Sequence, residues 1–178
     1  MLSDVLIRAG AIKFGDFVLT SGKRSNYYVD IKDACTDPSV LREITEGMKP
    51  HVRGVAVAGV ELGAVPLVVS TSLSLGLRYI IIRKERNHGT KKLIVGNVER
   101  GAEVTVLEDV VTTGNSVMRA VNMLREEGAT VRRVVCVVDR EEGGSQLLCN
   151  NGVELISLVK ARDFLGAKGS SDILGKPL

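Results

Sequence analysis

The feature that most constrains the fold is an alternation, between residues 55 and 160, of β-branched apolar runs with segments of helical periodicity. Continuous apolar runs are typical of strands buried on both faces, and their alternation with helices favours parallel pairing. The pattern therefore predicts an α/β fold with three α/β/α layers around a largely parallel sheet. The predicted strands cover residues 55–59, 77–82, 104–110, 131–139 and 153–160, and helices are expected at 64–76, after 116 and near 143–151.

The residues ahead of this core predict smaller elements. Apolar residues at helical spacing in 2–9, followed by Gly10, indicate a short amphipathic helix. Two short strands are expected around a polar loop within 14–30, and Asp37-Pro38 is typical of the first residues of a helix. We expect one domain over residues 1–178, with an N-terminal hood (1–35), a core (36–160) and a loosely packed tail (161–178).

Composition excludes several classes of protein. The chain has 178 residues, of which 44% are hydrophobic, so one aliphatic core is expected. Aromatic residues make up 3%, which argues against a nucleic-acid-binding surface built on stacked rings. The net charge of +3 is too small to indicate nucleic-acid binding by itself. The chain has no apolar stretch of about 18 residues and no secretory signal pattern, so no membrane span is expected. Three scattered cysteines favour a reducing, cytoplasmic environment.

The segment 104–116 carries the clearest chemical signal. A buried strand delivers Glu108 and Asp109 to the sheet edge, and Thr112-Thr113-Gly114-Asn115-Ser116 then opens a helix. A helix start offers unpaired N–H groups and a positive dipole end, and the glycine permits close approach of a phosphate. Carboxylates beside an anion site need another task, such as accepting hydrogen bonds from sugar hydroxyls. The segment therefore predicts a site for a phosphorylated sugar.

This segment resembles the 5-phosphoribosyl 1-diphosphate (PRPP) motif of the type I phosphoribosyltransferases. Three further segments, at 14–30, 83–89 and 139–141, are similar to the members of this family that use orotate as the base. The resemblance runs over residues 2–160. It implies the type I fold and transfer of ribose 5-phosphate from PRPP to orotate, which gives orotidine 5′-phosphate and diphosphate in pyrimidine biosynthesis. Rival interpretations are a purine-type phosphoribosyltransferase and a PRPP-sensing regulator of the same fold.

The resemblance also implies roles for individual residues in PRPP binding. Glu108 and Asp109 would hold the ribose hydroxyls, and residues 59–63 would hold the diphosphate through the backbone, with the Glu61 side chain turned away. The 5-phosphate would lie in a loop formed by Val110, Val111, Thr112, Thr113, Gly114, Asn115 and Ser116.

The basic segment 83–92 resembles the mobile loop that closes over PRPP in this family from the neighbouring subunit of a homodimer. Five of its residues are Lys or Arg against one Glu. Arg83, Lys84, Arg86 and His88 are expected to bind PRPP, and Lys84, Arg86 and Asp109 are the expected catalytic residues. Because an Arg stands where a Lys is usual, the role of the family's catalytic lysine falls to Arg86 or a neighbour. A solvated basic hairpin is the alternative interpretation.

The expected orotate site consists of Arg140, Thr112 and one of the adjacent Tyr27 and Tyr28. Arg suits bidentate recognition of a planar carboxylate, which orotate carries. Adjacent residues of a strand point to opposite faces, so only one of the two tyrosines should face the base. The resemblance implies Mg²⁺ as the cofactor, held mainly by PRPP and water, so no metal ligand is assigned to the protein.

Overall fold

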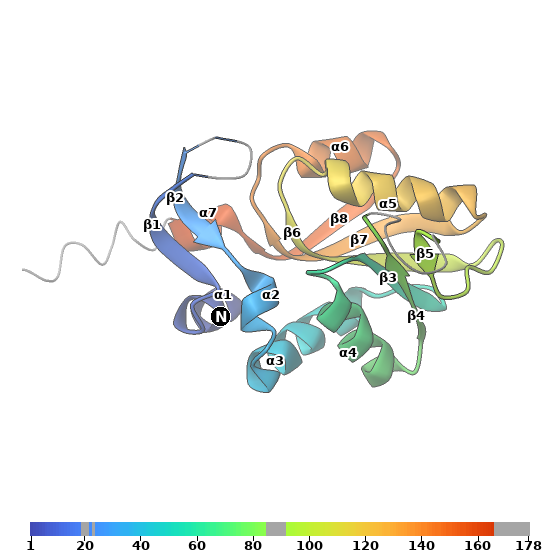
Figure 1. Cartoon of the computed structure of the whole chain (residues 1–178), viewed down its shortest axis with the longest axis horizontal. Helices are drawn as coiled ribbons and strands as arrows, with labels where there is room; N and C mark the ends of the chain where they lie inside the picture. Colours follow the sequence, from blue (N-terminus) through green and yellow to red (C-terminus); the bar gives the residue numbers. More distant parts are fainter. Residues whose placement is uncertain (19–21, 23, 85–91, 166–178) are drawn as a thin grey trace, which may run out of the picture.

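The computed structural model describes residues 1–18, 22, 24–84 and 92–165 (Figure 1). Within them the predicted elements occur in the expected order, with bounds close to the predicted ones. The elements are α1 (Leu2–Arg8), β1 (Ile12–Val18), β2 (Arg24–Val29), α2 (Ile31–Ala34), α3 (Pro38–Met48), a 3-10 turn (Lys49–His51), β3 (Ala56–Val60), α4 (Val65–Leu75), β4 (Arg78–Ile82), β5 (Ile94–Val95), β6 (Glu103–Val111), α5 (Asn115–Glu126), β7 (Thr130–Asp139), α6 (Gly144–Asn150), β8 (Glu154–Lys160) and α7 (Ala161–Leu165). Of these, α2, β5 and α7 are additional to the predicted elements.

The main sheet of the described residues has six strands in the order β5-β4-β3-β6-β7-β8. All neighbours pair in parallel except β5, which is antiparallel to β4. Helices α5 and α6 lie on one face of the sheet and α3 and α4 on the other (Figure 1). The largely parallel, three-layer architecture predicted from the alternating runs is therefore confirmed.

Side chains that alternate along the strands supply two separate cores. Val57 and Leu107 pack in the cluster that includes the residues of α3 and α4. Their neighbours Ala58 and Val106 pack instead with the apolar face of α5, which includes Leu124. Burying both faces of every central strand explains why the strands read as continuous apolar runs.

The N-terminal strands β1 and β2 form a separate antiparallel hairpin. The predicted pair of strands is confirmed, and the tip of the hairpin at 19–21 and 23 lies outside the described residues. Asp30 then begins the short helix α2, which the sequence pattern did not indicate, by accepting a hydrogen bond from the Asp33 N–H. Asp37 caps α3 as expected, accepting from the Ser39 N–H at 2.7 Å.

The expectation of a loosely packed tail is wrong for residues 161–165, which form α7. Phe164 is 1% exposed, and its ring lies edge-on to Tyr27 of β2, with centroids 5.3 Å apart, and to Phe14 of β1. The sequence pattern did not indicate this short helix, because the residues beyond 165 are rich in Gly and Ser and Phe164 is its one large buried side chain. Helix α7 therefore joins the end of β8 to the N-terminal hairpin (Figure 1). Residues 166–178 lie outside the described residues.

Candidate active site

The carboxyl ends of β3, β4 and β6 surround two adjoining cavities, of about 270 and 400 Å³. The two cavities share Lys84, Glu108, Asp109 and Ser116 in their lining, so they lie next to each other. In open parallel sheets this edge is where ligands bind. The smaller cavity is also lined by Lys32, Val60, Glu61, Leu62 and Gly63, and the larger one by Val110, Val111, Thr112, Thr113, Gly114, Asn115 and Val117.

The predicted carboxylate pair lies in β6, where Glu108 is buried and Asp109 half-buried. Burial raises the pKa of Glu108 well above its ordinary value, and the adjacent Asp109 acts in the same direction. Within the described chain the buried Oε2 of Glu108 has no hydrogen-bond partner. A buried polar atom without a partner is costly, so a ligand that donates a hydrogen bond there would be stabilised.

The backbone around Asp109 leaves no space for extra atoms. A Cβ built on Gly63 would lie 2.0 Å from Asp109 Oδ2. The other oxygen, Oδ1, accepts a hydrogen bond from the Val110 N–H at 2.9 Å. The loop after β3 and the carboxylate of β6 are therefore in direct contact, and glycine at position 63 permits that approach.

The segment after β6 forms an open helix start. Helix α5 begins after Gly114, whose φ of 82° favours glycine, and no side chain caps its N-terminus. The backbone of α6 supports this turn, because Gly144 N–H donates to the Thr112 carbonyl at 3.0 Å. The N–H groups at the start of α5 thus face the larger cavity without a competing cap, which is the arrangement that binds phosphate.

Glu61 turns its carboxylate towards the end of β4. Its Oε1 accepts a hydrogen bond from the Lys84 N–H at 2.8 Å, and its Oε2 lies 3.9 Å from Arg83 Nε. The same strand end marks the start of the basic segment, where Arg83 N–H donates to the Leu93 carbonyl at 2.7 Å. The segment thus leaves and rejoins the sheet at one place. The predicted Arg86 and His88 lie outside the described residues.

Arg140 forms a second cluster beside the hairpin. Its guanidinium lies 4.7 Å from the centre of the Tyr27 ring, and Nε donates to the Tyr27 hydroxyl at 3.1 Å. Nη2 reaches Ser25 Oγ at 3.3 Å, and Nε also lies 3.1 Å from Glu142 Oε1. The Arg140 N–H donates to the Val111 carbonyl, which connects this cluster through the backbone to residues 110–116, the segment expected to hold the 5-phosphate. Ser25 lies in the segment 14–30 that resembles the family but was given no individual role from sequence. Glu142 was missed because it follows the segment 139–141 and belongs to no recognised motif.

The two tyrosines of β2 occupy opposite sides of the hairpin, as the strand periodicity predicts. Tyr27 is 6% exposed and packs between Arg140 and Phe164. Tyr28 is more exposed, and its ring lies 5.7 Å from that of Phe17. Tyr27 is therefore part of the core, whereas the side chain of Tyr28 has exposed surface that can contact a ligand.

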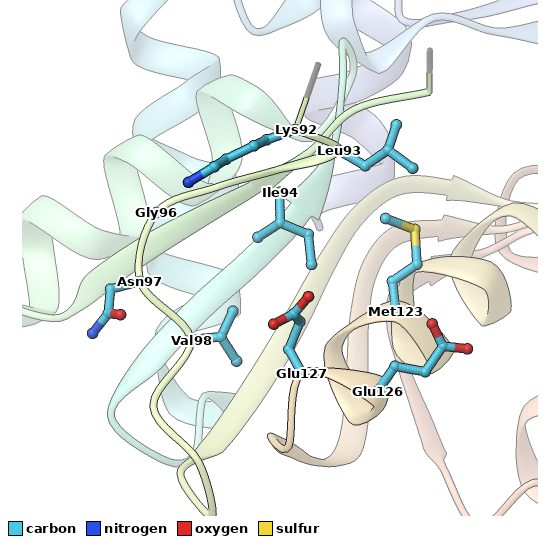
Figure 2. A pocket seen from close by; sticks show the side chains of 9 residues that line it. All are labelled: Lys92, Leu93, Ile94, Gly96, Asn97, Val98, Met123, Glu126 and Glu127. Atoms are coloured by element: carbon cyan, nitrogen blue, oxygen red, sulfur yellow. The ribbon is translucent and has the colours of Figure 1, made fainter. Parts of the chain in front are cut away.

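A larger cavity, of about 520 Å³, lies away from these residues (Figure 2). It is bounded by residues between Lys92 and Val98, by Met123 and Glu126 of α5, and by Glu127, the C-cap of that helix. Carboxylates at the C-terminal end of a helix, where the dipole is negative, disfavour phosphate. The candidate site is therefore chosen by its anion-binding groups and not by the size of the cavity.

This fold and this site define a phosphoribosyl transferase domain, and the family model described as "Phosphoribosyl transferase domain" matches residues 33–149. The chain is 61% identical to orotate phosphoribosyltransferase of Thermoplasma acidophilum over 165 residues, covering 93% of this chain and 96% of the relative. The chain therefore belongs to the phosphoribosyl transferase family and, within it, to the orotate phosphoribosyltransferases.

Solved structures agree with this placement. The crystal structure of orotate phosphoribosyltransferase from Aeropyrum pernix matches with a TM-score of 0.83 and 34% identity, covering 96% of this chain and 99% of that one. The Mycobacterium tuberculosis orotate phosphoribosyltransferase in complex with PRPP matches with a TM-score of 0.76 and 28% identity, covering 91% and 95%.

Proposed function

We propose that this chain transfers ribose 5-phosphate from PRPP to orotate, giving orotidine 5′-phosphate and diphosphate. One observation carries the proposal. An acidic pair in β6 and the uncapped start of α5 face two adjoining cavities at the carboxyl edge of the sheet. This combination suits a ligand with sugar hydroxyls at one end and a phosphate at the other.

PRPP would lie with its 5-phosphate at the start of α5, within residues 110–116. Its ribose hydroxyls would face Glu108 and Asp109, where a hydroxyl donor would satisfy the unpartnered Oε2 of Glu108. The diphosphate would extend towards the loop after β3 and towards Lys84, which lines both cavities. Arg83, Arg86 and His88 would complete the binding of the charged groups from the basic segment.

Catalysis would consist of positioning and charge stabilisation. Displacement at the anomeric carbon separates a cationic ribosyl group from an anionic diphosphate. The Asp109 carboxylate lies on the sugar side, and Lys84 with Arg86 supplies positive charge on the leaving-group side. Water exclusion strengthens each of these contacts, so closure of a basic segment over the site favours the reaction.

Orotate would bind next to Arg140, with Thr112 between base and phosphate loop. The Arg140 guanidinium is held by Tyr27 and Ser25, so its orientation is set before a ligand arrives. Tyr28 would supply the aromatic contact to the base because Tyr27 is already packed in the core. Orotate's carboxylate would then compete with Glu142 for the guanidinium.

Mg²⁺ fits this site as a partner of PRPP. Among the described residues, no group of three or more His, Cys, Asp or Glu side chains is arranged to hold a metal ion. The available donors are the Asp109 and Glu108 carboxylates, which are hard oxygen ligands of the kind Mg²⁺ prefers. Bound with diphosphate oxygens and water, Mg²⁺ would neutralise charge on the leaving group.

A homodimer would complete the site with the basic segment of the neighbouring subunit. Support comes from exposed apolar residues of α4, β4 and β5, at the β5 edge of the sheet; they are Leu73, Tyr79 and Val95. Mixing an Arg86→Ala variant with an Asp109→Asn variant tests this, because shared sites would restore part of the activity. Two inactive variants that stay inactive when mixed would exclude sharing.

No described helix is both long and apolar enough to cross a membrane. Cys35, Cys136 and Cys149 are free thiols, which supports a reducing compartment such as the cytoplasm.

The decisive experiment follows the ultraviolet absorbance of orotate after the protein, Mg²⁺ and PRPP are mixed. A fall in absorbance that requires PRPP is expected, and it identifies substrate and reaction together. Parallel reactions with uracil, adenine and hypoxanthine should show no PRPP-dependent change. Consumption of a purine instead of orotate would overturn the proposal, and PRPP binding without turnover of any base would favour a sensor.

A further inference from the structure

Lys32 lies in the smaller cavity although no recognised motif includes it. It belongs to α2, the short helix that follows the hood strand β2, and it lines the same space as Gly63, Lys84 and Asp109. Its side chain is 46% exposed, so the ammonium group remains open to a ligand. The hood thus contributes a cation to a space otherwise built from the carboxyl ends of core strands.

A carboxylate fixes the position of this cation. Lys32 Nζ donates to Asp30 Oδ1 at 2.6 Å, and Asp30 also caps α2 by accepting from the Asp33 N–H. The hydrogen bond to Asp30 raises the pKa of Lys32, and the charges of Tyr28 and Asp109 act in the same direction. An ammonium has three N–H donors, so binding to Asp30 leaves donors for a further acceptor.

The charges in the cavity explain why a second cation is needed there. Three acidic side chains, those of Glu61, Glu108 and Asp109, line the space, and burial favours the protonated form of Glu108 by raising its pKa. Lys84 is the cation that the core contributes among the described lining residues. A diphosphate entering beside the carboxylates of Glu61 and Asp109 would be repelled unless positive charge compensates. Lys32 approaches from the hood, and Lys84 lies at the end of β4.

We propose that Lys32 binds the diphosphate of PRPP, and the diphosphate released from it, from the hood side of the cavity. This inference rests on the proposed function, because it places the diphosphate beside the loop at 61–63. It adds a binding residue at a position that neither the PRPP motif nor the basic segment contains. It also gives the hood a role in holding the leaving group.

The test measures the affinity of the protein for diphosphate itself, in the presence of Mg²⁺, by calorimetry. Lys32→Met should weaken diphosphate binding about 10- to 100-fold, as expected for the loss of a hydrogen bond between charged groups. The KM for PRPP should rise in parallel. The affinity for orotidine 5′-phosphate, which lacks the diphosphate, should change less than about twofold. Lys32→Arg should keep most of the diphosphate affinity because it keeps the charge.

Lys49→Met is the matched control. Lys49 also pairs with a nearby carboxylate, Glu46, at 2.8 Å, but it lines neither cavity of the site. Its loss should leave diphosphate affinity unchanged. If Lys32→Met does not fold, Lys32→Gln keeps length and polarity and removes the charge, and the same loss is expected.

Two results would overturn the inference. If folded Lys32→Met or Lys32→Gln binds diphosphate with unchanged affinity, Lys32 only forms a surface ion pair with Asp30 and does not bind the ligand. If the substitution lowers the affinities for diphosphate and for orotidine 5′-phosphate equally, Lys32 does not act specifically on the leaving group. The proposed function is tested separately by orotate turnover of the unmodified protein, so the two ideas can fail independently.

Discussion

Replacing Arg140 by alanine should weaken the use of orotate far more than the binding of PRPP. The Arg140 side chain is 9% exposed, so a carboxylate bound to it is poorly screened by water. A hydrogen bond to a charged group contributes about 1.5–3 kcal/mol. Orotate must displace Glu142, which is 31% exposed and contributes about 1 kcal/mol at most. The net loss is about 0.5–2 kcal/mol, or roughly 2- to 30-fold in the KM for orotate.

The competing carboxylate provides the sharpest check of this reasoning. Glu142→Gln removes the charge that occupies Arg140 in the structure, so the KM for orotate should fall by up to about fivefold. Steady-state kinetics with orotate and PRPP varied in turn measures both variants. A control is Arg133→Ala, at the other end of β7, where Nε and Nη2 pair with Glu154 and both KM values should stay unchanged.

The reasoning fails if Arg140→Ala weakens orotate and PRPP equally, since Arg140 would then support the fold of the whole site. It also fails if Glu142→Gln weakens orotate as much as Arg140→Ala does. In that case the ion pair itself, rather than a free guanidinium, would be what the base requires.

Three further changes test the structure around the site. Gly63→Ala would place a Cβ 2.0 Å from Asp109 Oδ2. The value of kcat/KM for PRPP should therefore fall about tenfold or more, while the melting temperature changes little. Unchanged kinetics would show that the Asp109 side chain can move freely. Phe164→Ala should lower the free energy of unfolding by about 3–5 kcal/mol in denaturant titration, whereas a loss below about 1 kcal/mol would mean that α7 is not part of the core. The raised pKa of Glu108 means that, above its ordinary value of 4.5, the folded protein keeps a proton that the unfolded chain has lost. Stability should therefore fall as pH rises from about 4.5 through the raised pKa, and Glu108→Gln should remove that slope; an identical pH profile in both proteins would contradict the shift.

Local regularities were enough to predict most of the fold. The apolar runs at 104–110 and 131–139 mark strands buried on both faces, and the structure places them as neighbours β6 and β7. The uncapped strand-to-helix junction was also predictable from sequence, because Glu108 to Ser116 are contiguous and its geometry depends mainly on these neighbouring residues. Strand β5 was missed because a two-residue strand has no periodicity and exists through pairing with β4.

The sequence by itself determined the layered α/β architecture and the acidic pair followed by an open helix start, because burial period and turn chemistry act over a few neighbouring residues. Only the tertiary structure decided which distant residues join them. Arg140 meets Tyr27, 113 positions away, because α7 and the hood pack against the end of the sheet, and Glu142 reaches it through the loop after β7. Lys32 enters the cavity because β2 leads into a helix beside β6. Such contacts depend on strand order and on how separate elements pack, which no local spacing encodes.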